Sequence, residues 1–174
     1  MNVRCAANCL PLLIQQHNVY ATDFFNRSWA EYKVGFNDTR GNYWLGNDLL
    51  SELTNNRYRL RFELHAVNGT WYWAEYSSFV VRSEADNYRL LVSGYSGNAG
   101  DALSDQNNKM FTTYDRDNDD FRHHCAVYNG GGFWYKYCSW CSVTAIRGRG
   151  ESFRWYTPQT GNLLLQISRM WLMC

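Results

Sequence analysis

A strict alternation of apolar and polar side chains is the feature that most limits how this chain folds. Between Tyr58 and Ala66 every second side chain is apolar, and the polar positions are Arg59, Arg61, Glu63 and His65. A period of two predicts a strand with one face in the core and the other in water. The dipeptide Asn68-Gly69 follows, and a second strand-like run covers 71–81. Together these runs predict a β-hairpin.

Further strand signals lie at 88–96 and 163–173, whereas helical signals are few. Asp48 is placed to cap a short helix through 49–54, and residues 28–36 have room for another turn or two. The chain has 2 Pro, 13 Gly, 8 Trp, 13 Tyr and 9 Phe. This balance is typical of short strands joined by many turns.

Length and charge exclude several classes of protein. A chain of 174 residues suffices for one domain with a substantial core and is short for two. Its 17 basic and 16 acidic residues leave a net charge of +1 without a basic stripe. We therefore expect neither a nucleic-acid partner nor a polybasic membrane surface. No apolar run approaches the length of a membrane span.

An acidic run in a polar, irregular stretch carries the clearest chemical signal. Four carboxylates fall within six positions, at Asp115, Asp117, Asp119 and Asp120. Such a cluster repels itself unless a cation binds, and calcium takes about six to eight oxygen ligands. An EF-hand is excluded, because its glycine and glutamate positions are occupied by Asp120 and Ala126. The residues alone leave another type of cation site and a solvated acidic turn equally open.

The 6 cysteines leave two chemistries open beside this run. In one, a disulfide between Cys125 and Cys138 closes a small loop. In the other, zinc is held in an intracellular, reducing compartment by His123, His124, Cys138 and Cys141. A redox C-x-x-C is disfavoured because no βαβ pattern surrounds it. Cys/His hydrolysis is disfavoured because no orienting third group is evident, so we do not expect an enzyme.

Three N-x-[S/T] sequences, at Asn26, Asn37 and Asn68, and the even cysteine count favour the secretory pathway. The first residues imitate a signal peptide poorly, because two cysteines interrupt them. We expect a secreted, extracellular glycoprotein. Cys5 with Cys9, and Cys141 with Cys174, are further candidate pairs, and Cys174 is also a candidate link between subunits.

Several separated strings resemble one known family in order and spacing. They run from about Asp23 to Met173 and include WLGND, YSGNAGDAL, MFTTYDRDND, GGFWYKYC and QISRMWL. The chain resembles the C-terminal fibrinogen-related domain of fibrinogens, ficolins, tachylectins, tenascins and angiopoietins. This implies an α+β, β-rich fold with a mainly antiparallel sheet, short helices and a long calcium-binding loop region. On this basis 1–22 is a divergent N-terminal segment and 23–174 a partial domain, with strands of the sheet missing and an edge exposed.

The resemblance also implies site residues. Calcium is expected on the side chains of Asp117 and Asp119 and on the carbonyls of Phe121 and His123. The family pairs Cys125 with Cys138 and places a cis peptide bond before Cys138. The ligand-binding residues expected are Phe133, Trp134, Tyr135, Tyr137, Cys138 and Ser139.

The recognition residues depart from the family pattern. Ser139 replaces a histidine, Asn129 replaces an aromatic residue, and Thr144-Ala145 replaces an asparagine-glycine pair. The rings of 133–135 are therefore as good candidates for the core as for a pocket. The function implied is calcium-dependent binding of glycans, acetylated ligands or extracellular proteins, as a lectin of innate immunity or an extracellular-matrix adhesion module. A homo-oligomer, disulfide-linked or non-covalent, is a further candidate partner. The alternatives are the zinc or redox protein and a fragment without binding activity.

Overall fold

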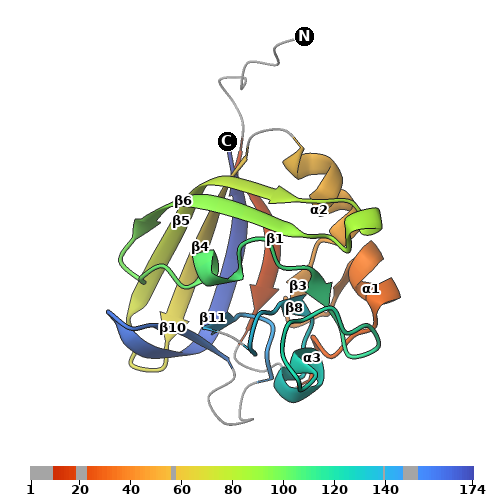
Figure 1. The fold of residues 1–174 in the computed structure, drawn as a ribbon. Helices are drawn as coiled ribbons and strands as arrows, with labels where there is room; N and C mark the ends of the chain where they lie inside the picture. Colours follow the sequence, from red (N-terminus) through yellow and green to blue (C-terminus); the bar gives the residue numbers. More distant parts are fainter. Residues whose placement is uncertain (1–9, 19–22, 56–57, 139, 147–152) are drawn as a thin grey trace.

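The computed structural model describes residues 10–18, 23–55, 58–138, 140–146 and 153–174. Its main sheet is antiparallel and has the strand order β2-β3-β1-β11-β4-β5-β6 (Figure 1). These strands are β1 (Leu12–His17), β2 (Phe36–Asn37), β3 (Tyr43–Trp44), β4 (Tyr58–Ala66), β5 (Trp71–Val81), β6 (Leu90–Gly97) and β11 (Gly161–Met173). Four short strands complete the pairing, with β10 (Arg154–Thr157) on β11, β9 (Cys141–Ser142) on β10, and β7 (Phe111–Thr112) on β8 (Phe133–Trp134).

The predicted hairpin is confirmed. Strands β4 and β5 pair antiparallel, with Leu64 opposite Tyr72. The apolar positions Leu60, Phe62 and Leu64 are fully buried, because every second side chain of β4 faces the core. The predicted strands near residues 90 and 165 are confirmed as β6 and β11.

The helices of the described chain are short. They are α1 (Trp29–Val34), α2 (Asn47–Thr54) and α3 (Cys125–Asn129), with 3-10 turns η1 (Glu84–Asp86) and η2 (Leu103–Gln106). Ser28 begins α1 with a capping box, in which its side chain accepts from the Glu31 amide while the Glu31 carboxylate accepts from the Ser28 amide. The β-rich, antiparallel class with short helices is confirmed.

The prediction that Asp48 caps α2 is wrong. The capping position belongs to Gly46, whose φ is +112° and which supplies no side-chain bond. A Cβ at this position would lie 2.8 Å from the carbonyl carbon of Val34, so only glycine lets the start of α2 approach the end of α1 so closely. Asp48 lies in the first turn instead, where it accepts a 2.5 Å hydrogen bond from the Tyr88 hydroxyl.

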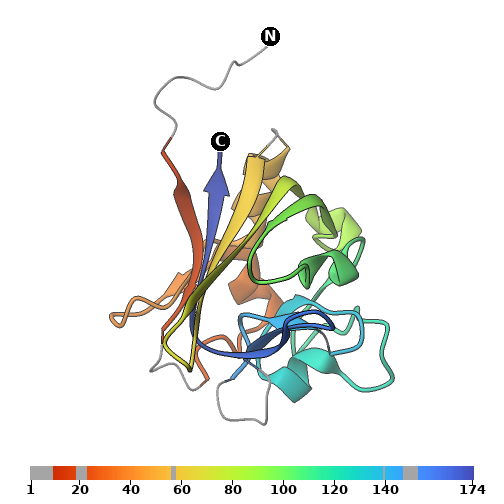
Figure 2. The ribbon, with the colours of Figure 1, turned by 90° about the vertical axis from the view of Figure 1, so that its left-hand side faces the viewer.

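The helices α1, α2 and α3 and the green-to-cyan loop segments lie on one face of the main sheet (Figure 2). The core between these layers is rich in rings. Tyr32 contacts both Trp44 and Phe111, and Phe111 packs edge-on against Trp134 at 5.1 Å between ring centroids. Phe62 of the sheet contacts Trp155 of β10. The high aromatic content therefore joins the sheet to the loop-rich region, by which we mean residues 98–146.

Part of the divergent N-terminal segment is built into the sheet. Strand β1 pairs with β11 on one side and with β3 on the other. Its Gln15 is buried and donates to the Ser168 hydroxyl at 3.0 Å. The expected boundary near residue 22 therefore does not coincide with an edge of the sheet, whose main strand order ends at β2 and β6. Among the helices described, none is long and apolar enough to cross a membrane.

Candidate ligand-binding and metal site

The acidic run forms a loop between β7 and α3. A tight turn opens it, because the amides and carbonyls of Thr113 and Arg116 bond each other at 3.0 Å. The side-chain amide of Asn118 then donates to the Phe111 carbonyl at 2.8 Å, and the backbone amide of Asn118 donates to the Thr112 hydroxyl. The loop is thus anchored to β7 by its own backbone and side chains.

The four aspartates have separate surroundings. Asp115 accepts from the Trp29 amide at 2.8 Å and from the Thr113 hydroxyl at 2.7 Å, so it joins the loop to the start of α1. Asp120 pairs with Lys109. Only Asp117 and Asp119 stay close to each other.

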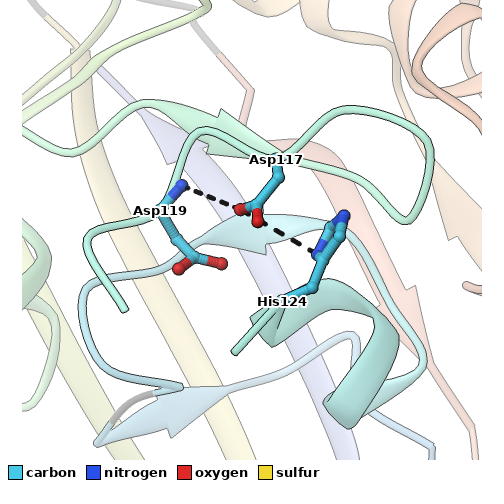
Figure 3. A group of neighbouring side chains, drawn as sticks. All are labelled: Asp117, Asp119 and His124. Carbon is cyan, nitrogen blue, oxygen red and sulfur yellow. Dashed lines mark hydrogen bonds and ion pairs between the residues drawn. The ribbon is translucent and has the colours of Figure 1, made fainter. Parts of the chain in front are cut away.

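Asp117 and Asp119 meet His124, and one ligand atom from each of the three lies within 4.8 Å of the others (Figure 3). Nδ1 of His124 lies 4.0 Å from Oδ1 of Asp117 and has no hydrogen-bond partner among the described residues. The Asp119 amide donates to Asp117 at 3.3 Å. The structure thus brings together the two predicted carboxylates and adds an imidazole that was expected only in the zinc alternative.

The Asp119 carboxylate has two opposing influences on its pKa. Burial raises this pKa, and the neighbouring Asp117 charge raises it further, while hydrogen bonds from the amides of Cys125 and Phe121 lower it. The net result is a pKa above the ordinary value. A bound cation would relieve the repulsion, and hard carboxylate and carbonyl oxygens are the donors that calcium prefers. The donor set therefore fits calcium, and calcium binding stays a prediction.

Cys125 and Cys138 form a disulfide that joins the start of α3 to the end of the segment after β8. The carbonyl oxygen of His123 lies 3.8 Å from Sγ of Cys138, so this predicted calcium ligand borders the disulfide. The expected cis bond before Cys138 is wrong, since no cis bond occurs in the described chain. The chain turns here through a left-handed φ of +52° at Cys138.

The disulfide also removes the zinc and redox alternatives. Cys138 is bonded to Cys125, and Cys141 is free and buried, with its thiol 2.6 Å from Oε1 of Gln106. Of the two sulfurs of the C-x-x-C sequence, one is therefore in a disulfide and the other is a buried free thiol. Cys174 is disulfide-bonded, so it does not pair with Cys141. Cys5 and Cys9 lie outside the described residues.

An open hollow of about 850 Å³ lies beside this disulfide. Apolar side chains with unusual exposure gather on it, namely Phe121, Val127, Tyr128 and Tyr137, which are 37%, 49%, 65% and 60% exposed. Its polar and sulfur lining is Arg122, His123, His124, Cys138 and Arg154. The hollow thus combines aromatic surface with positive charge.

The predicted ligand-binding residues divide into two groups. Tyr137 and Cys138 line the hollow. Phe133, Trp134 and Tyr135 are fully buried in the core. Polar bonds fix the last two, because the Trp134 indole donates to the Tyr88 carbonyl and the Tyr135 hydroxyl donates to the Gly131 carbonyl. Ser139 lies outside the described residues.

Sequence reasoning missed Val127, Tyr128 and the two arginines of the hollow. Helical phase carries a signal for the first two, because α3 turns Cys125 and Ala126 inward and leaves the next two side chains outside. Arg122 and Arg154 are far apart in sequence and carry no such signal. Asn129, at the departure from the family pattern, is buried and donates to the Cys138 carbonyl at 3.3 Å.

A model of the family described as fibrinogen beta and gamma chains, C-terminal globular domain, matches residues 7–166. Mouse angiopoietin-related protein 7 is 39% identical over 154 residues, 84% of this chain and 46% of the relative. The human fibrinogen alpha chain is 41% identical over 157 residues, 82% of this chain and 18% of the relative. The chain spans less than half the length of these curated relatives.

Two solved structures have the same fold. The fibrinogen-like globe domain of human ANGPTL6 superposes with a TM-score of 0.84 at 33% identity, covering 92% of this chain and 76% of that one. Lamprey fibrin D-dimer, complexed with the peptide ligand Gly-His-Arg-Pro-amide, gives 0.76 at 27% identity, with 92% and 60% covered. The fold, the disulfide next to the acidic loop and the family match lead to one conclusion. This chain belongs to the family of fibrinogen C-terminal globular domains.

Proposed function

We propose that this domain is an extracellular binding module whose partner occupies the hollow beside the Cys125–Cys138 disulfide. The observation that carries this proposal is the gathering of exposed Phe121, Val127, Tyr128 and Tyr137 around one concave surface. Exposed rings in a concave site are typical of binding surfaces. The peptide-bound lamprey fibrin structure supports a short peptide segment as the kind of ligand.

The charged residues of the hollow indicate which kind of peptide segment would bind there. Arg122 and Arg154 line the hollow together with two histidines. An acidic peptide segment with an aromatic or aliphatic anchor complements this lining better than a basic one does. A protein partner in adhesion or signalling is therefore our first candidate. Acetylated glycans, read in a lectin-like or innate-immune role, are the second, because the exposed rings of Tyr128 and Tyr137 suit stacking against sugars.

The experiment is a binding screen with acidic peptides, basic peptides including Gly-His-Arg-Pro-amide, and a glycan and acetylated-ligand array. Tyr128→Ala is expected to weaken the true ligand at least about tenfold, as a loss of about 1.4 kcal/mol implies. Val34→Ala is a matched control, since Val34 is 73% exposed and does not line the hollow. A ligand that binds wild type and Tyr128→Ala equally well would place recognition elsewhere.

We further propose that calcium stabilises the loop that borders the hollow. The ion would be held by the carboxylates of Asp117 and Asp119 and by the carbonyls of Phe121 and His123. Its chemistry here is structural, since it neutralises the paired carboxylates and fixes the backbone that presents Phe121 and His123. The support is the crowding of two carboxylates at one point of the loop.

Thermal melting with calcium and with a chelator tests this part. Calcium at about one hundred times its Kd is expected to add about 2.7 kcal/mol to the free energy of unfolding. Asp117→Asn is expected to remove that response. Equal melting temperatures with millimolar calcium and with chelator would rule the site out.

A further inference from the structure

Asn68 lies at the tip of the β4–β5 hairpin, the yellow turn at the lower left of Figure 1. The turn is closed by two 3.0 Å bonds, from the Gly69 amide to the Ala66 carbonyl and from the Ala66 amide to the Thr70 carbonyl. The Thr70 amide also donates to Oδ1 of Asn68 at 2.9 Å. The side-chain oxygen of Asn68 is therefore engaged, and its Nδ2 has no hydrogen-bond partner among the described residues. Residues 67–70 are all exposed.

An aromatic platform borders this turn on the outer face of the sheet. Nε2 of His65 lies 3.2 Å from the Gly69 carbonyl oxygen, so the imidazole reaches the turn itself. Trp71 stacks on that imidazole, with ring centroids 4.5 Å apart and planes inclined by 22°. Trp71 is nevertheless 45% exposed. A large ring that is fixed by a neighbouring ring and remains exposed to solvent is a preorganised surface for a bound group.

The platform continues into a hollow of about 280 Å³. Its lining is Arg61, Glu63, Trp71, Tyr72, Trp73 and Arg169. Arg61 lies 4.8 Å from the ring centre of Trp73, and Arg169 lies 5.4 Å from that of Trp71. Indole surfaces accept the C–H faces of a pyranose, while guanidinium and carboxylate groups bond its hydroxyls. The hollow therefore has the chemistry of a site for one or two sugar rings.

The other two acceptor sequences differ from this arrangement. Asn26 and Asn37 are exposed, as Asn68 is. However, the Ser28 hydroxyl that completes the Asn26 sequence is engaged in the capping box of α1. Asn37 lies within β2, where it pairs with Tyr43 of β3. Asn68 is the acceptor whose own hairpin carries a stacked, exposed tryptophan.

We propose that Asn68 carries an N-linked glycan whose first N-acetylglucosamine packs on Trp71 and whose next sugars extend over the hollow. In the transfer, a bond forms between Nδ2 and C1 of an oligosaccharide carried on a lipid diphosphate. The C1–O bond to the diphosphate breaks, and Nδ2 loses one proton. The glycan thus covers part of the outer face of the sheet. This proposal rests on the extracellular location proposed above, but not on the hollow beside the disulfide.

The test uses the whole chain secreted from animal cells, in an Asn26→Gln, Asn37→Gln background. Glycopeptide mass spectrometry measures the occupancy of Asn68, which is expected to be nearly complete. The glycan is then removed fully with a peptide N-glycosidase, which leaves aspartate, or trimmed to a single N-acetylglucosamine. Full removal is expected to lower the melting temperature by about 3 °C. Trimming is expected to keep most of the stabilisation, because the first sugar makes the contact with Trp71.

Trp71→Ala separates stacking from a general effect of glycosylation. In this variant the glycosylated and deglycosylated forms are expected to melt at the same temperature. Trp71→Leu, which keeps an apolar side chain without a flat ring, serves if the alanine variant is not secreted. Hydroxyl-radical footprinting adds a second readout, since Trp71 is expected to oxidise several-fold more slowly in the glycosylated protein.

Three results would overturn the proposal. They are an unoccupied Asn68, a melting difference that survives in Trp71→Ala, or equal oxidation of Trp71 with and without the glycan. None of these results alters ligand binding at Tyr128, so a failure here is distinguishable from a failure of the proposed binding site.

Discussion

The sheet and the loop-rich region both bury aromatic rings, but they hold them in different ways. In the sheet, long strand pairs such as β4 with β5 and β4 with β11 carry the rings, and the pleat alone decides which side chains face inward. In the loop-rich region, β7 and β8 pair over only two residues each. There, single polar bonds fix the rings, as when the Trp134 indole donates to the Tyr88 carbonyl at 2.7 Å. The sheet should therefore tolerate loss of one contact better than the loops do, unless the lost group fills the core.

The largest effect is expected from a cavity in the core beneath the sheet. Phe62 is fully buried in β4 and contacts Trp155 of β10. Phe62→Ala is expected to lower the free energy of unfolding by about 3–5 kcal/mol. Chemical denaturation measures it, with Glu52→Ala on the exposed side of α2 as a control near zero. A loss of stability confined to the sheet would mean that the two regions unfold separately.

Removal of the Cys125–Cys138 disulfide is expected to cost about 3 kcal/mol, because the bond closes a loop of 13 residues. The paired variant Cys125→Ser, Cys138→Ser avoids a free thiol. Hydrogen exchange should show the loss of protection in α3 and the acidic loop, and little change in β4 and β5. Uniform loss of exchange protection across the sheet would show that the disulfide does not act on the loop-rich region alone.

Substitutions of Asp115 and Asp117 are expected to differ in how their effect on stability depends on calcium. Asp115→Ala removes the acceptor for the Trp29 amide and the Thr113 hydroxyl, and is expected to cost about 1–2 kcal/mol with or without calcium. Asp117→Ala is expected to change stability by less than about 0.5 kcal/mol in chelator. Its effect should appear only when calcium is added. Paired melts of both variants in calcium and in chelator decide the matter.

The smallest expected effect is a dependence of stability on pH, and calcium is expected to reverse its direction. Because the pKa of Asp119 is raised in the folded state, the folded protein holds this proton more tightly than the unfolded chain. In chelator, the contribution of Asp119 to stability therefore falls as the pH rises from the unfolded-state pKa through the folded-state pKa. In excess calcium the ion competes with the proton, so stability should rise over the same window. Asp119→Asn should remove both trends in melts between about pH 4 and pH 7.

The same contrast explains what the sequence predicts. The period of two in β4 identified a strand and both of its faces, because that information is local. The fates of Trp134 and Tyr135 could not be inferred in this way, since their burial depends on carbonyls at Tyr88 and Gly131. The Asp48 cap failed for a related reason. The close contact of α2 with α1 favours a glycine at the cap, and nothing local to Asp48 signals that contact.

Site residues followed the same division. The family resemblance implied Asp117 and Asp119, which stand two positions apart, and the structure keeps them together. Arg122 and Arg154 were missed because the fold, and not the sequence, brings them to one hollow. Family resemblance supplied the residues around the disulfide, but it did not anticipate the trans bond at Cys138.

The buried thiol of Cys141 can report on opening motions of the loop-rich region. Its thiol is the free one among the described cysteines, it is fully buried, and burial raises its pKa well above the usual value. While β9 stays paired in the fold, an alkylating reagent therefore cannot reach Cys141, and the thiol is not in its reactive thiolate form. The rate of labelling at Cys141 then measures how often this part of the loop-rich region opens, and a ligand or cation that slows the labelling reveals its coupling to the interior.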